Sequence, residues 1–135
     1  MDTQGLTATK WDTVENKEKF IRQFKAFVLS GFKPAKFTKA FYTRLSMTFG
    51  HSAHYNQAGF YSVFFSTTAG KIAFVRQNLN YTCGGDPAFT YSDVERILQT
   101  WLREQGILEK LMAELAEEVE ISERAELARL QAKYT

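Results

Sequence analysis

Twelve phenylalanines in 135 residues are the feature that most constrains the fold of this chain. Large aromatic rings dominate the energetics of a core, so their spacing indicates which segments pack together. From Phe20 to Val28 the apolar residues recur at intervals of three and four, which is the spacing of one helix face. Asp12 precedes this segment as an N-cap acid would, and Gly31 follows it as a left-handed C-terminal residue would. The sequence therefore predicts a helix over residues 13–30.

A second helix is predicted from Pro34 to Gly50, because proline has the backbone angle of a first helical position and glycine readily ends a helix. Phe37 and Phe41 recur along one side of this segment. The next apolar run, FYSVFF at residues 60–65, is rich in aromatic and branched side chains and is too short for a typical helix. This run is predicted to be a strand.

The segment that follows Ser66 has two interpretations. KIAFVRQ could be the return strand of a hairpin across TTAG, which would give a small antiparallel sheet. Alternatively, Ser66 or Thr67 caps a helix in which Ile72 and Val75 share a face, and we favour this interpretation. The glycines and the Asp-Pro pair within residues 81–89 predict a loop.

The last third of the chain reads as helix. TYSD at residues 90–93 resembles a capping box, and an amphipathic pattern follows it. Gly106 either ends this helix or weakens a longer one that continues through it. From Glu117 onward the sequence is mostly charged residues and alanine, so residues 120–135 are predicted to form a helix that projects from the domain or pairs with another chain.

Together these patterns predict a mainly α protein, a single compact domain over residues 1–135 with four or five helices and one short strand or hairpin. The alternative is an α+β fold with a small antiparallel sheet. Residues 1–11 are polar and are expected to be a flexible N-terminus. The predicted core residues are Phe20, Phe24, Phe27, Phe41, Leu45, Phe64, Val75, Leu98 and Trp101.

The sequence offers little support for an enzyme. His51 and His54 could bind one metal ion, with Cys83 or Asp86 as a third ligand, and a metal-dependent hydrolase is the function that would follow. Against this, the HxxH pair lacks the glutamate of zinc proteases, and no second pair of closely spaced ligands occurs. The chain also contains no phosphate loop, dinucleotide fingerprint or nucleophile elbow. We therefore assign no catalytic residue, metal ligand or cofactor.

The compartment follows from the cysteine count and the absence of long apolar segments. Cys83 is the only cysteine, so an intramolecular disulfide is impossible and the reducing cytoplasm is the expected location. No window approaches the roughly 18 apolar residues of a membrane span, and the first residues do not resemble a signal peptide. A soluble protein without a membrane partner is expected.

Three groups of residues are candidate binding residues. Lys33, Lys36, Lys39 and Arg44 crowd the start of a helix with no acid nearby, an arrangement that suits a phosphate or an acidic partner, although a solvated basic face is the simpler interpretation. An aromatic connector follows this helix, and an acidic segment lies near the C-terminus. The connector residues are His51, His54, Tyr55 and Tyr61, and the acidic residues are Glu114, Glu117 and Glu118.

The distribution of charge completes the functional expectation. Residues 1–90 carry eleven Lys and Arg against five acids, whereas residues 91–135 carry six against ten. Segregated charge without a catalytic signature is typical of a small binding or regulatory protein, such as an inhibitor or adaptor, that engages a protein or a nucleoprotein complex. Direct nucleic-acid binding through the lysines is the alternative. The C-terminal helix could also pair with a second copy of this chain.

Overall fold

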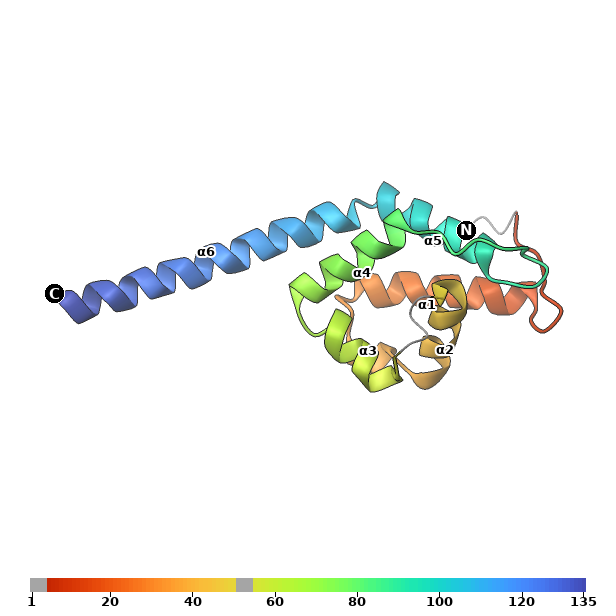
Figure 1. Cartoon of the computed structure of the whole chain (residues 1–135), viewed down its shortest axis with the longest axis horizontal. Helices are drawn as coiled ribbons and strands as arrows, with labels where there is room; N and C mark the ends of the chain where they lie inside the picture. Colours follow the sequence, from red (N-terminus) through yellow and green to blue (C-terminus); the bar gives the residue numbers. More distant parts are fainter. Residues whose placement is uncertain (1–4, 51–54) are drawn as a thin grey trace.

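The computed structural model of the chain describes residues 5–50 and 55–135. Within these residues it contains six α-helices, one short 3-10 helix and no strand. Figure 1 shows five helices gathered into a domain and the sixth extending away from it. The elements are α1 (Val14–Leu29), η1 (Pro34–Lys36), α2 (Lys39–Thr48), α3 (Gln57–Phe64), α4 (Thr68–Asn80), α5 (Ser92–Glu104) and α6 (Ile107–Tyr134).

The mainly α fold class is confirmed, but the predicted strand at residues 60–65 is wrong, because this run belongs to helix α3. The Asn56 side chain caps α3 by accepting a hydrogen bond from the Gly59 backbone N–H at 2.6 Å. The helix then places Phe60 and Phe64 on one face, where their ring centroids are 4.7 Å apart. Aromatic packing thus outweighs the strand propensity of the individual residues. Residues 5–50 and 55–135 also contain six α-helices, whereas four or five were predicted.

Helix α4 confirms the favoured interpretation of the segment after Ser66. Thr67 caps α4 by accepting a hydrogen bond from the Gly70 N–H at 3.0 Å, so the hairpin alternative is wrong. Gly70 also marks the close approach of α3 to α4, since a Cβ atom at this position would lie 2.5 Å from the carbonyl oxygen of Val63. Only glycine permits this approach without a shift of the backbone.

Two predicted helix starts need correction. Pro34 begins the short η1, and α2 starts five residues later, where Thr38 accepts a hydrogen bond from the Phe41 N–H at 3.1 Å. The cap of α1 is Thr13 instead of Asp12. In both cases a threonine hydroxyl accepts a hydrogen bond from a free N–H of the first turn.

The predicted capping box at residues 90–93 is also wrong. Helix α5 has Tyr91 at its N-cap position, and no side chain caps the helix there. The hydroxyl of Thr90 instead accepts a hydrogen bond from the Ser92 N–H, and Asp93 is used for a contact with α1. The local pattern was present, but a tertiary ion pair determines where the carboxylate points.

The core is aromatic, as the phenylalanine count indicates. Ten of the buried apolar residues are phenylalanines, and their rings form a continuous set of tilted and edge-on contacts. Seven of the nine predicted core residues are buried, while Phe64 and Trp101 are half-buried and pack against the core. Phe65 occupies the central place that was predicted for Phe64, because the helical periodicity of α3 turns Phe65 inward.

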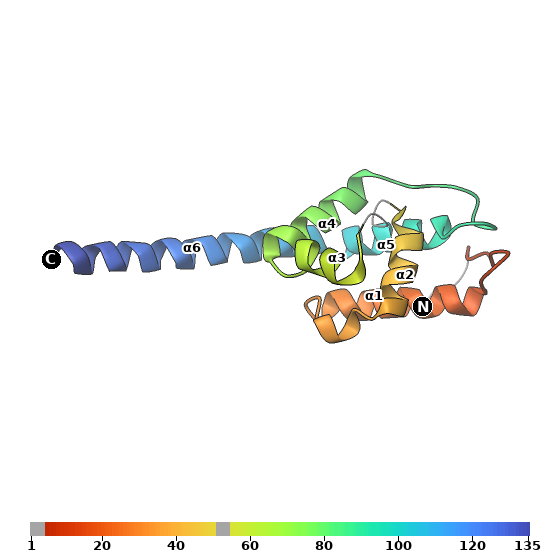
Figure 2. The ribbon, with the colours of Figure 1, turned by 60° about the horizontal axis from the view of Figure 1, so that its bottom comes forward.

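The direction of α6 is determined at Gly106. This residue separates α5 from α6 and has a left-handed backbone with φ +60. Helix α6 then packs on α4 and α5 over its first turns, with Ile107 and Leu111 buried. Figures 1 and 2 show the remainder of α6 leaving the domain, and every residue from Ala116 to Thr135 is exposed. No helix in the described part of the chain is long and apolar enough to span a membrane.

Candidate interaction surfaces

The lysine face comprises Lys33, Lys36 and Lys39, which are the N-cap of η1, its last residue and the first residue of α2. All three are exposed. Within residues 5–50 and 55–135 no carboxylate forms an ion pair with any of them. The first turn of α2 contains no acid, so the positive end of this helix adds to the charge of the lysines.

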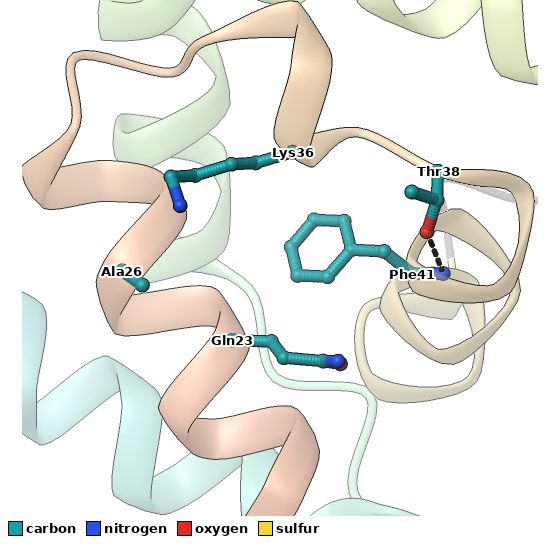
Figure 3. Close-up of a pocket in the computed structure, with 5 residues that line it drawn as sticks. All are labelled: Gln23, Ala26, Lys36, Thr38 and Phe41. Carbon is teal, nitrogen blue, oxygen red and sulfur yellow. Dashed lines mark hydrogen bonds between the residues drawn. The ribbon is translucent and has the colours of Figure 1, made fainter.

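A pocket of about 240 Å³ adjoins the lysine face. Figure 3 shows the Phe41 ring at its centre, with Lys36 reaching across on one side and Gln23 of α1 on the other. Thr38 and Ala26 complete the lining. The pocket therefore combines an aromatic floor with a positively charged rim, and its size suits a side chain better than a complete ligand.

The structure places Arg44 away from this face, although the sequence grouped it with the three lysines. The Arg44 guanidinium donates hydrogen bonds to Asp12 and to the Tyr91 hydroxyl, the latter at 2.7 Å. The Tyr91 hydroxyl in turn donates to Asp12. Arg44 therefore connects α2 to the segment before α1 and to the start of α5, which is a structural use of its charge.

The same network changes two pKa values. Burial alone would raise the pKa of Asp12, but hydrogen bonds from Tyr91, Asn16 and Arg44 outweigh burial and lower it to about 2. Burial raises the pKa of Tyr91, and its hydrogen bond to the Asp12 carboxylate raises it further. At neutral pH the network holds an ionised carboxylate, a neutral phenol and a guanidinium.

The aromatic connector lies partly outside the described residues, which do not include His51 and His54. Tyr55 is exposed, and its ring meets the rings of Phe60 and Phe64 edge-on. Tyr61 is half-buried and donates its hydroxyl hydrogen to the Phe32 carbonyl at 2.6 Å. Burial raises the pKa of Tyr61. Of the two tyrosines of the aromatic connector, Tyr55 presents more surface to a partner.

The three predicted acidic residues of α6 have different surroundings. Glu118 accepts a hydrogen bond from the Thr68 hydroxyl at 2.6 Å and so ties α6 to α4. Glu114 lines a groove together with Lys71 and Lys110. Glu117 is exposed. Further along the helix, Glu120 and Glu123 share one face with exposed apolar residues.

We define the outer face of α6 as five exposed residues that lie within about one third of the helix circumference at 3.6 residues per turn. Its apolar members are Val119, Leu127 and Leu130, which are 46%, 56% and 36% exposed. Together they form an exposed apolar row on the helix. Two glutamates lie between them. The five residues are Val119, Glu120, Glu123, Leu127 and Leu130.

A buried ion pair at the opposite end of the domain was missed at the sequence level. The Lys17 ammonium lies 2.8 Å from the Asp93 carboxylate, and both side chains are almost fully buried. Lys17 also donates to the carbonyl oxygens of Pro87 and Thr90, each at 3.1 Å. The only signal in the sequence was that Lys17 falls on the same helical side as Phe20 and Phe24.

Glu95 is a second buried acid, and it organises the loop that contains Cys83. Its carboxylate accepts hydrogen bonds from the backbone N–H groups of Cys83 and Gly84. The exposed Cys83 thiol accepts a hydrogen bond from the Gly50 N–H at 3.2 Å. In the described part of the chain, no three His, Cys, Asp or Glu side chains are grouped as a metal site would require.

Comparison of the chain with protein-family models, with curated proteins and with solved structures finds no match.

Proposed function

We propose that this protein is a small non-enzymatic binding or regulatory module that engages another macromolecule, a protein or a nucleoprotein complex, through the outer face of α6. The observation that carries the proposal is that α6 continues beyond the domain while Leu127 and Leu130 remain exposed on it. Apolar side chains in a row on a projecting helix suit the groove of a partner, where burial of their surface supplies the binding free energy.

Charge on the same face supports a selective contact. Glu120 and Glu123 lie among the apolar residues, and Glu120 forms an ion pair with Arg124 of the same helix, at 2.7 Å in solvent. Exposed pairs of this kind are weak and exchange readily for a partner's cation. The expected partner surface is therefore apolar at its centre and basic at its rim.

Affinity capture from the source cell tests this proposal. Wild-type protein and the double variant Leu127→Glu/Leu130→Glu are used as baits, and the captured proteins are identified by mass spectrometry. A partner that binds the outer face should not be captured by the variant. In the complex the two leucines would be buried in an apolar contact, and the variant places charged groups there.

The matched control is Ala128→Glu/Ala132→Glu, which adds the same charges on the opposite side of α6. Both alanines are exposed, so this variant keeps the fold and is expected to retain the partner. Equal capture by wild type and by both variants would contradict the proposed function.

Direct nucleic-acid binding through the lysine face is a second candidate function. It is favoured by three exposed lysines around the positive end of α2, without a neighbouring acid among the described residues. Phosphate groups bind such helix ends together with lysines. This version predicts that binding weakens steeply as salt is added, because each phosphate contact releases a counterion.

The test measures the affinity for single- and double-stranded oligonucleotides across a salt series. Replacing Lys33, Lys36 and Lys39 with alanine should reduce the slope of the logarithm of the binding constant against the logarithm of the salt concentration. The reduction should correspond to the loss of up to about three phosphate contacts. Undetectable binding of both DNA and RNA at low salt rejects this candidate. Capture experiments with and without nuclease separate it from the first proposal.

A further inference from the structure

We infer that the outer face of α6 in one copy of this protein docks on the lysine face of a second copy. The inference deepens the proposed function, on which it rests, by naming a second copy of this chain as a partner of α6. It follows from three features of the described residues: complementary charge, a pocket beside the lysines, and the exposure of the outer face on the projecting half of α6.

The first feature is the charge of the two faces. Residues 114–126 of α6 contain six glutamates and one arginine, whereas residues 33–39 contain three lysines and no acid. Glu120 and Glu123 of the outer face are three residues apart, as are successive lysines in the sequence. Opposite charges on two surfaces favour their encounter and help to orient the contact.

The second feature is the pocket next to Lys36. Its volume of about 240 Å³ and its Phe41 floor provide space for an apolar side chain. Leu127 and Leu130 lie about one and two turns beyond Glu123 on the outer face. On the outer face of one copy, the two glutamates are followed by leucines. On the second copy, the lysines lie beside an aromatic pocket, so the glutamates can contact the lysines while a leucine enters the pocket.

The third feature is the course of α6 within one molecule. Figures 1 and 2 show the second half of α6 extending beyond the domain that contains η1 and α2. The helix is anchored by Ile107 and Leu111 in the core and by the bond from Thr68 to Glu118. The first turns of α6 are held against the domain, so Glu120 and Glu123 lie on its exposed half, where a second copy can reach them.

Sedimentation velocity of the full chain, purified free of nucleic acid, tests the inference. Wild-type protein at low salt should sediment with a mass above that of the monomer, and added salt should weaken the association. Lys36→Glu/Lys39→Glu should weaken self-association at least tenfold, and Glu120→Lys/Glu123→Lys should have the same effect, since each variant places like charges together.

The deciding measurement is an equimolar mixture of these two variants. In the mixture, the helix with lysines in place of glutamates can face the domain surface with glutamates in place of lysines. Association should therefore return in the mixture, although each variant alone is monomeric. Ala128→Glu/Ala132→Glu, on the opposite side of α6, should associate like the wild type. Circular dichroism of each variant confirms that the helices are intact.

A monomeric wild type at low salt, or a mixture that stays monomeric, overturns the inference. Neither outcome affects the proposed function, which depends on partner capture by the same outer face. If capture instead fails while the wild type self-associates and the mixture recovers, the second copy is the only supported partner and the wider proposal is rejected.

Discussion

The domain and the projecting half of α6 hold oppositely charged side chains at almost the same distance but in different surroundings. Lys17 and Asp93 are 2.8 Å apart and buried, whereas Arg124 and Glu120 are 2.7 Å apart with 78% and 60% of their side chains exposed. The buried pair cannot lose one member without leaving a charge in the core. The exposed pair loses little, because water replaces the partner. Burial, and not distance, separates a structural charge from one that is free to bind.

The largest effect is expected from Asp93→Ala in the buried pair. The change leaves the Lys17 ammonium buried without its carboxylate and removes an acceptor of the Thr7 N–H. Loss of one member of a buried ion pair costs about 3–5 kcal/mol of the free energy of unfolding. Urea denaturation monitored by circular dichroism measures this loss. A cost below about 1 kcal/mol would show that water reaches this site and that the comparison fails.

Gly70→Ala tests the packing of the domain with an effect of intermediate size. In an exposed helix this change would stabilise the protein by about 1 kcal/mol, since alanine is the better helix former. At Gly70 the new Cβ would lie 2.5 Å from the Val63 carbonyl oxygen, so we expect a loss of about 1–3 kcal/mol instead. A lower urea midpoint for the variant than for the wild type would confirm this loss. A more stable variant would mean that α3 and α4 move apart without cost.

Acid titration tests the Asp12 network at the edge of the domain. The pKa of Asp12 in the folded protein is about 2, below its ordinary value of 3.8, so its stabilising contribution is complete above the ordinary value. This contribution is lost as the pH falls from about 4 to about 2. Asp12→Asn removes that part of the pH dependence. The free energies of unfolding of the two proteins, measured by denaturation between neutral pH and pH 2, should therefore converge as the pH falls. A constant difference between them would contradict the lowered pKa of Asp12.

The smallest effect is expected in the projecting half of α6. Glu120→Ala/Arg124→Ala removes an exposed pair four residues apart and should change the free energy of unfolding of the monomer by less than about 0.5 kcal/mol. The measurement is made at high salt, so that self-association does not contribute. A loss above about 1 kcal/mol would show that this half of α6 contributes to the stability of the domain.

The sequence predicted most helices because their signals are local. Regular apolar spacing identified α1, and a threonine cap with apolar residues on one face identified α4. The signals failed at two places. FYSVFF has the composition of a strand, yet the Asn56 cap and the Phe60–Phe64 contact make it a helix. The buried pair of Lys17 and Asp93 joins residues far apart in the sequence, so no local pattern could reveal it.

The candidate surfaces were predictable in composition but not in geometry. The three lysines and the acidic helix are visible in the sequence, whereas the pocket beside Lys36 requires α1, η1 and α2 to come together. Arg44 was grouped with the lysines because it is close in sequence, although its side chain points to Asp12 and Tyr91. Proximity along a helix does not determine which side of the domain a charge occupies.

The left-handed backbone of Gly106 has a consequence for how this protein responds to its own abundance. This residue ends α5 and sets the course of α6, so that the outer face lies on the projecting half of the helix and the lysine face lies on the domain. Recognition between those faces then becomes bimolecular, and its extent depends on how many copies a cell contains. A helix that folded back onto its own lysines would neutralise them at any dilution. With Gly106 in place, the complementary charges remain available until molecules become numerous enough to meet.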